Sequence, residues 1–256
     1  MQVVKDAAIS KVDEYRARLR SLKQWNRFLL KESGLPGPRG NLELAQAFAL
    51  EADLDQVLAL LSIPHHEAPE NTPQAFLVFC GVSALGRHIA GGDPHRLGIL
   101  RDYASDSRWR IREAVAMALQ YLGDADMKSL LRAARAWSRG NWLEKRAAAA
   151  GICEPRLLKD PAAASAVLTI LDAITASMAR TQERNSEPFR ILRQGMGYCW
   201  SVAVAAHPAA GRRLIKKWIG SSDPDIRWIM KQNLTKNRLL KLDPAWVKSM
   251  LTQLDH

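Results

Sequence analysis

Apolar residues recur at three- and four-residue spacing along most of the chain, which is the pattern of amphipathic helices. Residues 5–31 predict one long helix, with Val12 and Leu19 in its apolar stripe and a ridge of bases beside it. Clusters of Gly, Pro and small polar residues predict loops at 33–40 and 62–73. Further helices are predicted over residues 42–50, 53–61, 73–89, 96–103, 109–122, 125–137, 142–153, 161–182, 189–206, 209–219, 226–239 and 243–254.

A short phrase recurs along the chain: a turn, then a basic residue, then an apolar helix. It occupies residues 106–119, 141–150 and 223–234. Equivalent positions in successive helices are 35, 34, 47 and 34 residues apart, and these anchors are Leu77, Arg112, Arg146, Arg193 and Arg227. One helical hairpin per step accounts for this period. Stacked hairpins form a solenoid that presents a long concave surface to a partner.

The segment Asp223-Pro224-Asp225-Ile226-Arg227 resembles the turn of HEAT repeats. In that turn an aspartate caps the second helix, an aliphatic residue enters the core and an arginine reaches back to neighbouring repeats. We therefore expect an all-α chain, an α-solenoid of about six or seven HEAT-like helical hairpins. The expected organisation is a single domain over 1–256, with an N-terminal capping helix and loop at 1–40, helical repeats at 41–242 and a C-terminal capping helix at 243–256.

The net charge of the chain favours one class of binding partner. The 256 residues include 37 Lys and Arg against 26 Asp and Glu, a formal net charge of +11. This balance favours a polyanion. The charges are unevenly distributed, because residues 41–75 hold six acids and no Lys or Arg, whereas residues 212–241 hold nine bases and two acids. The alternative interpretation is a well-solvated basic surface without a ligand.

Three segments resemble the DNA alkylation repeat family. Residues 141–148, Asn-Trp-Leu-Glu-Lys-Arg-Ala-Ala, are similar to that family's Trp-Leu-Gln-Arg-Ala-Ala segment with one extra residue. Trp109 and Glu113 resemble its Trp-x-x-x-Asp pair, and residues 226–236 resemble a terminal alkylation repeat. The chain departs from the family at Gln232, where a second Trp is expected, and in the 81-residue step from Arg146 to Arg227. The resemblance spans residues 96–242 loosely.

This family consists of HEAT-like solenoids and includes alkylpurine DNA glycosylases. The resemblance implies that Arg146 contacts the DNA backbone. It also implies catalytic roles for Trp109 and Glu113, which would flank the modified nucleotide and stabilise positive charge developing on the sugar. Their four-residue spacing places both on one helix face. In the alternative interpretation Trp109 packs between hairpins and Glu113 pairs with a nearby arginine.

Basic residues gather around the turns of the repeats. Lys128, Arg132, Arg135 and Arg139 recur at four, three and four residues and so share one helix face. More bases lie at neighbouring turns: Arg108, Arg110, Arg112, Lys145 and Arg146. If those turns face one groove, the bases form a track for phosphates; otherwise they are a solvated outer face with scattered ion pairs. The residues expected to contact nucleic acid are Arg112, Lys145, Arg146, Arg227 and Lys231.

Other features of the sequence bear on metal binding, membrane association and cellular location. The cysteines are far apart in apolar stretches, which predicts small buried side chains in a reducing compartment: Cys80, Cys153 and Cys199. His65, His66 and Glu67 are consecutive in a proline-rich loop, so we expect neither a metal site nor another cofactor. No apolar run approaches the ~20 residues that span a bilayer. The N-terminus lacks the apolar core of a secretory signal, so we expect a cytoplasmic protein without a membrane partner.

These features lead to one functional expectation and one rival. We expect a monomeric helical-repeat module that holds duplex DNA in a basic concave groove, with alkylpurine DNA glycosylase activity in base-excision repair as an extension. The rival is a non-catalytic HEAT-repeat scaffold that binds an acidic protein partner. The charge of the concave surface discriminates between the two interpretations.

Overall fold

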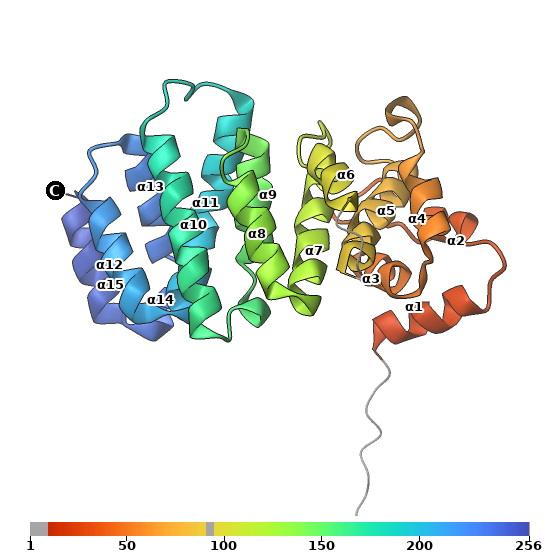
Figure 1. Cartoon of the computed structure of the whole chain (residues 1–256), viewed down its shortest axis with the longest axis horizontal. Helices are drawn as coiled ribbons and strands as arrows, with labels where there is room; N and C mark the ends of the chain where they lie inside the picture. Colours follow the sequence, from red (N-terminus) through yellow and green to blue (C-terminus); the bar gives the residue numbers. More distant parts are fainter. Residues whose placement is uncertain (1–9, 91–94, 256) are drawn as a thin grey trace, which may run out of the picture. The chain divides into compact units, whose positions relative to one another are not determined.

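The computed structural model describes residues 10–90 and 95–255, and every regular element within them is helical (Figure 1). The all-α prediction is confirmed for these residues. The described chain forms two compact units, unit 1 (Met1–Ala118) and unit 2 (Leu119–His256). The long helix α7 (Trp109–Ala125) contributes residues to both. The single domain stays a prediction, and the turn expected at residues 91–94 lies outside the described residues.

Unit 1 is organised around one apolar helix, α5 (Pro73–Ala90), most of whose side chains are buried. It contacts helices on several sides, namely α2 (Asn26–Lys31), α3 (Leu42–Glu51), α4 (Leu54–Leu61) and α6 (Arg96–Tyr103). The helix α1 (Lys11–Arg20) packs on α3. The loop before α5 contains a short 3₁₀ turn, His65–Glu67. Predicted helices at 42–50, 53–61, 73–89 and 96–103 are therefore confirmed to within a residue at each end.

The long helix predicted over residues 5–31 is wrong where the structure describes it. Helix α1 ends at Arg20, where the Ser21 N–H donates to the carbonyls of Ala17 and Arg18, and α2 begins only at Asn26. Trp25 fixes the break, because its indole donates to the Leu22 carbonyl and its ring meets Phe48 edge-on at 5.7 Å. This tertiary contact overrides the apolar period of the segment. Residues 5–9 lie outside the described chain.

The basic ridge of α1 and the acidic stretch that follows it neutralise each other in part. Glu51, at the end of α3, forms ion pairs with Arg16 and Arg20 at 2.7 Å each. Hydrogen bonds from Arg20 and Arg16 lower the pKa of the Glu51 carboxyl, against a smaller opposing effect of burial. The uneven charge along the sequence is thus partly an internal pairing of unit 1.

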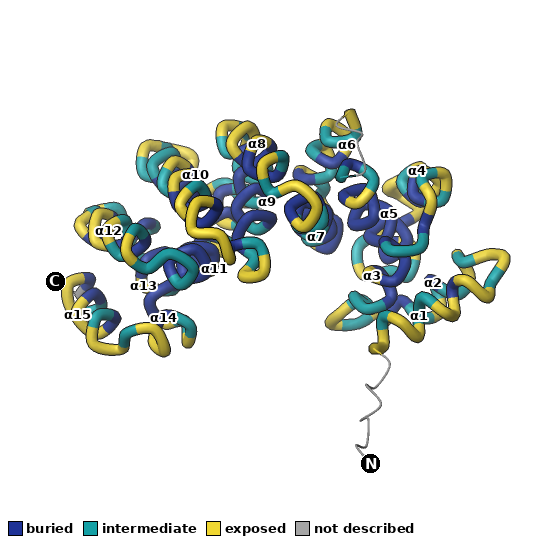
Figure 2. Tube along the Cα trace, turned by 60° about the horizontal axis from the view of Figure 1, so that its bottom comes forward, coloured by how far each residue is buried: buried dark blue, intermediate teal, exposed yellow. Residues whose placement is uncertain are grey.

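Unit 2 consists of helices in two rows (Figure 2). The α8 row contains α8 (Met127–Trp137), α10 (Pro161–Ala179) and α12 (Pro208–Ile219), and the α11 row contains α9 (Trp142–Ile152), α11 (Glu187–Ala206) and α13 (Pro224–Leu234). Neighbours in sequence pair between the rows, and neighbours within each row also touch. The short helix α14 (Asn237–Leu242) and the last helix α15 (Pro244–Asp255) close the C-terminal end of the unit.

Polar side chains begin the helices of unit 2. Asp126, Asn141, Asp160, Ser186 and Asp223 each accept a hydrogen bond from a backbone N–H in the first turn of the helix that follows. These caps satisfy amides that have no partner inside the helix. The predicted starts agree to within two residues, because the sequence contains these capping residues explicitly.

Three predicted helix ends in this part of the chain are wrong. Helix α10 ends at Ala179 and not at residue 182. Helix α7 does not stop at Gly123 but runs on to Ala125. A Cβ at Gly123 would lie 2.6 Å from a Leu130 methyl and 2.9 Å from a Leu157 methyl, so the glycine permits close packing within the helix and does not end it. The helix predicted over 226–239 is two helices, α13 and α14. The buried Asn233 side chain donates to the Met196 and Ile229 carbonyls and accepts from the Ser201 N–H, which fixes the end of α13 against α11.

Helix α10 is 19 residues long and is apolar enough, by length and composition alone, to cross a membrane. The sequence expectation that no apolar run approaches the ~20 residues of a membrane span missed this helix. Half of its apolar window is buried inside the protein, where it contacts both rows of unit 2. A buried core helix passes the same test of length and composition, so the expectation of no membrane partner stays a prediction.

The cysteines Cys80, Cys153 and Cys199 are buried and free, as predicted. Burial raises the pKa of the Cys80 thiol well above 9.0, which keeps it protonated. These thiols therefore act as small apolar side chains of the core.

Candidate functional site

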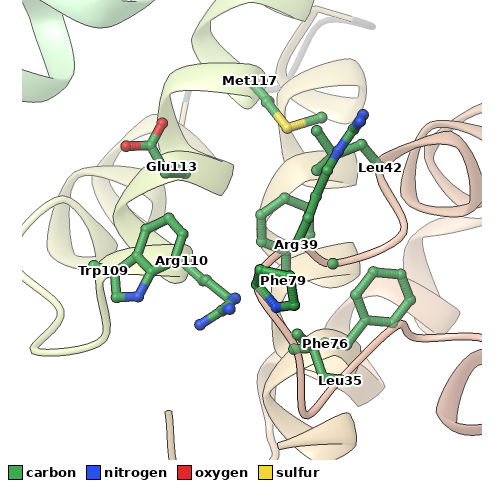
Figure 3. Close-up of a pocket in the computed structure, with 11 residues that line it drawn as sticks. Leu35, Arg39, Leu42, Phe76, Phe79, Trp109, Arg110, Glu113 and Met117 are labelled. Carbon is green, nitrogen blue, oxygen red and sulfur yellow. The ribbon is translucent and has the colours of Figure 1, made fainter. Parts of the chain in front are cut away.

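Unit 1 contains a pocket of about 360 Å³ beside the start of α7 (Figure 3). One wall comes from the first turns of α7 and includes Trp109, Glu113 and Met117. The facing wall comes from α5, through Phe76 and Phe79, and from the loop and helix start at residues 35–42. The pocket is therefore mainly apolar and aromatic, with a few charged groups at its edge, which is the usual character of a small-ligand site.

The two residues predicted to be catalytic lie in this pocket together. Trp109 is 47% exposed, which is unusual for so large an apolar side chain and leaves its ring accessible. Glu113 follows one turn later on α7 and is half-buried. The four-residue spacing thus places an aromatic ring and a carboxylate on one wall, as the sequence predicted.

Arg110 also lines this site, whereas the sequence predicted it only as one of the bases at the repeat turns. Its guanidinium lies 4.4 Å from the centre of the Trp109 ring, and its side chain is buried. It forms an ion pair with Glu70 at 2.6 Å and donates to the Gly37 carbonyl at 2.7 Å. Arg110 therefore holds the indole ring in place from one side. The Trp-Arg dipeptide was a signal for this contact, but the partners Glu70 and Gly37 are distant in sequence.

The turn before α7 is fixed by a buried ion pair. Arg108 and Asp106 have side chains only 5% and 9% exposed and lie 2.7 Å apart. Arg108 also donates to the Ala68 carbonyl at 2.9 Å. Burial raises the pKa of the Asp106 carboxyl, but hydrogen bonds from the Arg108 side chain and backbone outweigh it and lower that pKa below 3.8. The start of α7, and with it Trp109, is thus rigidly attached to the loop before α5.

The predicted nucleic-acid contacts have different surroundings. Arg112 is buried and donates to the carbonyls of Asp106 and Ser107 in its own turn. Lys145 is 8% exposed and donates to the Gly140 carbonyl at 2.6 Å. Arg227 is half-buried and donates to the Leu254 carbonyl of α15. These three residues hold backbone segments together, so their phosphate contacts stay predictions.

The other two predicted contacts lie on the α11 row. Arg146 of α9 is half-buried, and its Cγ lies 3.5 Å from where a side chain at Gly195 would begin. Lys231 of α13 is exposed. Between these helices, α11 exposes one stripe at three- and four-residue spacing, namely Glu187, Arg190, Gln194 and Tyr198. The structure therefore brings Arg146 beside α11, in the row that also carries Lys231.

Tyr198 is a feature that sequence reasoning missed. It is 45% exposed, and the Arg238 guanidinium of α14 lies 4.6 Å from its ring centre and donates to its hydroxyl. An exposed aromatic ring beside a guanidinium is typical of surfaces that bind nucleic acid. We call the residues Arg146, Arg190, Gln194, Tyr198, Lys231 and Arg238 the α11 surface.

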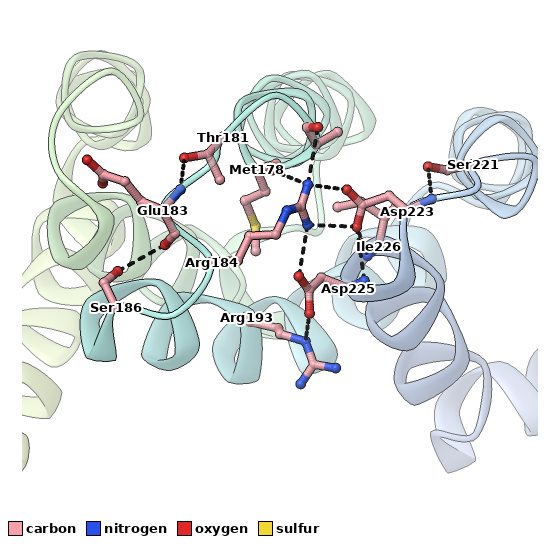
Figure 4. Close-up of polar contacts among 11 residues, drawn as sticks. Met178, Thr181, Glu183, Arg184, Ser186, Arg193, Ser221, Asp223, Asp225 and Ile226 are labelled. Carbon is pink, nitrogen blue, oxygen red and sulfur yellow. Dashed lines mark hydrogen bonds and ion pairs between the residues drawn. The ribbon is translucent and has the colours of Figure 1, made fainter.

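Arginines also join the helix starts of unit 2 (Figure 4). Arg184, in the loop between α10 and α11, donates to Asp223 and to Asp225. Arg193 of α11 lies 2.7 Å from the second oxygen of Asp225 and 3.8 Å from the Trp228 ring centre. Asp223 is the residue that caps α13. The arginine that contacts this turn from a neighbouring loop is thus Arg184, whereas the sequence predicted that role for Arg227.

The described residues contain no group of three or more His, Cys, Asp or Glu side chains that could hold a metal ion. His65 lies in an exposed turn, where its Nε2 is 2.9 Å from the Ser107 hydroxyl. Comparison with known proteins adds no relative, because no family model, curated protein or solved structure matches this chain.

Proposed function

We propose that this protein is a helical-repeat module that binds duplex DNA through the α11 surface. The observation that carries the proposal is an excess of basic over acidic residues around an exposed aromatic ring, because the α11 surface has four bases and Glu187 is the exposed acid at the start of its stripe. Residues 145–152, 188–206 and 226–242 contain no Asp or Glu, yet they supply every base of the α11 surface. Phosphate contacts from such bases provide most of the affinity for DNA, and Tyr198 offers a flat face beside them.

The finer architecture belongs to the same proposal. We infer that the helices form HEAT-like hairpins stacked as a solenoid. The two rows of unit 2 support this, because α8 with α9, α10 with α11 and α12 with α13 are consecutive pairs that also contact the next pair. In such a stack, equivalent helices line one continuous surface, which is where a long partner lies.

Duplex binding is expected to depend on the α11 surface. The double variant Arg190→Gln/Lys231→Gln should weaken binding to a labelled duplex by about tenfold or more, because two charge-assisted phosphate contacts are lost. Fluorescence anisotropy at a fixed low ionic strength measures this. The matched control is Arg213→Gln/Lys216→Gln, which removes two exposed bases from α12 in the other row.

A control variant that loses as much affinity as the first would show only dependence on net charge and would sink the assignment to the α11 surface. Failure of the wild-type protein to bind duplex even at low salt would instead favour the scaffold function. The next experiment would then be a search for an acidic protein partner.

The pocket of unit 1 supports base excision as an extension. A cationic alkylated purine could stack on the accessible face of Trp109, opposite the face that Arg110 covers. The Glu113 carboxylate in the same wall would stabilise positive charge as the glycosidic bond breaks. This assignment rests on the family resemblance together with the shared pocket.

If Glu113 has this role, Glu113→Gln should slow the release of methylated purines from alkylated duplex by about a hundredfold. Chromatography of the released bases measures the rate. Glu43→Gln, a partly exposed acid on α3, is the control and should release bases at the wild-type rate. Release by the wild-type protein that stays at the uncatalysed level, or that Glu113→Gln leaves unchanged, would rule out base excision through this residue.

A further inference from the structure

A second pocket, of about 420 Å³, lies in unit 2 among the end of α8, the turn after it, the first turn of α9 and α10. Four bases line it: Arg135, Arg139, Lys145 and Arg180. No Asp or Glu is among its lining residues, and Ile170 and Ala173 of α10 supply an apolar part. Lys145 comes from α9 and is the chain neighbour of Arg146, but the pocket shares no lining residue with the α11 surface.

The guanidinium groups of this pocket are not neutralised by the protein. Arg135, Arg139 and Arg180 are exposed, and within the described part of the chain none of them forms an ion pair. Elsewhere in unit 2 bases lie against acids, as Lys217 does with Asp172 at 2.8 Å. The three positive charges that line this pocket repel each other. An anion that binds there offsets the repulsion, so the pocket attracts anions.

Lys145 adds a buried positive charge to the pocket. The residue is 8% exposed, and its ammonium lies 4.6 Å from the centre of the Trp142 ring. Burial lowers the pKa of the Lys145 ammonium. Among the described residues it makes one hydrogen bond, to the Gly140 carbonyl, whereas an ammonium can donate three. Donors therefore remain for a ligand in the pocket.

We propose that this pocket binds a phosphate monoester. Guanidinium groups match the spacing of phosphate oxygens and can donate two parallel hydrogen bonds, and a dianion suits a site with several positive charges. The volume of about 420 Å³ exceeds the needs of the phosphate group alone, so an attached organic group can lie against Ile170 and Ala173. The phosphate can belong to a small metabolite or to the end of a nucleic-acid strand.

The test is calorimetric titration of the whole protein with inorganic phosphate and with AMP as a monoester. We expect saturable binding of both. The variant Arg139→Gln/Arg180→Gln should weaken it by about tenfold or more, because two of the exposed donors are removed. The control Arg213→Gln/Lys216→Gln lowers the net charge equally outside the pocket and should bind like the wild type. No saturable binding by the wild type, or equal losses in both variants, would overturn the proposal.

Two further arms identify the source of the phosphate and separate this inference from the proposed DNA binding. Short duplexes with a 5′-phosphate or a 5′-hydroxyl end are titrated into the wild type and both variants. A preference for the phosphorylated end that Arg139→Gln/Arg180→Gln abolishes assigns the pocket to strand ends. Equal affinity for the two duplexes, with AMP binding still lost in that variant, assigns it to a small molecule. The pocket does not depend on duplex binding, because AMP tests it directly.

Discussion

Replacing Asp106 by alanine is expected to lower the free energy of unfolding by about 3–5 kcal/mol, because the change leaves the buried Arg108 guanidinium without its counter-charge. The two side chains are 5% and 9% exposed, and Asp106 also accepts a hydrogen bond from the Arg108 backbone at 2.8 Å. A buried charge that loses its carboxylate partner carries an uncompensated cost of removal from water. Chemical denaturation followed by circular dichroism measures the loss.

The control for this change is Glu43→Ala in the same unit. Glu43 pairs with Arg39 at 3.3 Å, but the two side chains are 40% and 65% exposed. Solvent screens such a pair, so the expected loss is at most about 1 kcal/mol. Similar losses for the two variants would mean that the Asp106–Arg108 pair does not hold the start of α7 in place.

The stabilisation by the Asp106–Arg108 pair should also depend on pH. The folded pKa of Asp106 lies below its ordinary 3.8, so the pair contributes its full stability above pH 3.8. That contribution is lost as the pH falls through the folded pKa, where the carboxylate becomes protonated. Asp106→Ala should therefore show a smaller fall in stability than the wild type as the pH drops below about 4.

The second large effect is expected at Gly86, where α5 meets α7 inside unit 1. A Cβ at this position would lie 2.1 Å from the Ala118 carbonyl oxygen and 2.5 Å from the carbonyl carbon. These are backbone atoms, so no side-chain rotation relieves the clash and the two helices must move apart. We expect Gly86→Ala to destabilise the protein by about 3 kcal/mol or more.

Gly98, in α6, is the matched control for Gly86. A Cβ there would meet no atom within 4 Å. Alanine is the better helix former, so Gly98→Ala should stabilise the protein by up to about 1 kcal/mol. If Gly86→Ala unfolds at the wild-type denaturant concentration, the close approach of α5 and α7 is not a property of the folded protein.

The sequence predicted the helices well where a capping residue marks the start of the helix. Asp126, Asn141, Asp160 and Asp223 are capping residues that can be recognised without any tertiary information. It failed where a distant contact ends a helix. The Trp25 ring against Phe48 and the Asn233 side chain against α11 interrupt segments whose apolar period continues.

The candidate sites, too, were predictable only where the spacing of residues along one helix determines them. Trp109 and Glu113 share a helix face by spacing alone, so their common pocket wall was predictable. The opposite wall, with Phe76 and Phe79, depends on how α5 meets α7, which no local pattern encodes. The number of basic residues could also be read from the sequence. The burial of Arg112 within its own turn could not.

The most direct test of the account is the salt dependence of duplex binding. The slope of log K against log salt counts phosphate contacts, at about 0.9 per contact for duplex DNA. We predict a steep slope for the wild type, reduced by about 1.8 in Arg190→Gln/Lys231→Gln and unchanged in Arg213→Gln/Lys216→Gln. A slope that is the same in all three proteins would contradict DNA binding by the α11 surface.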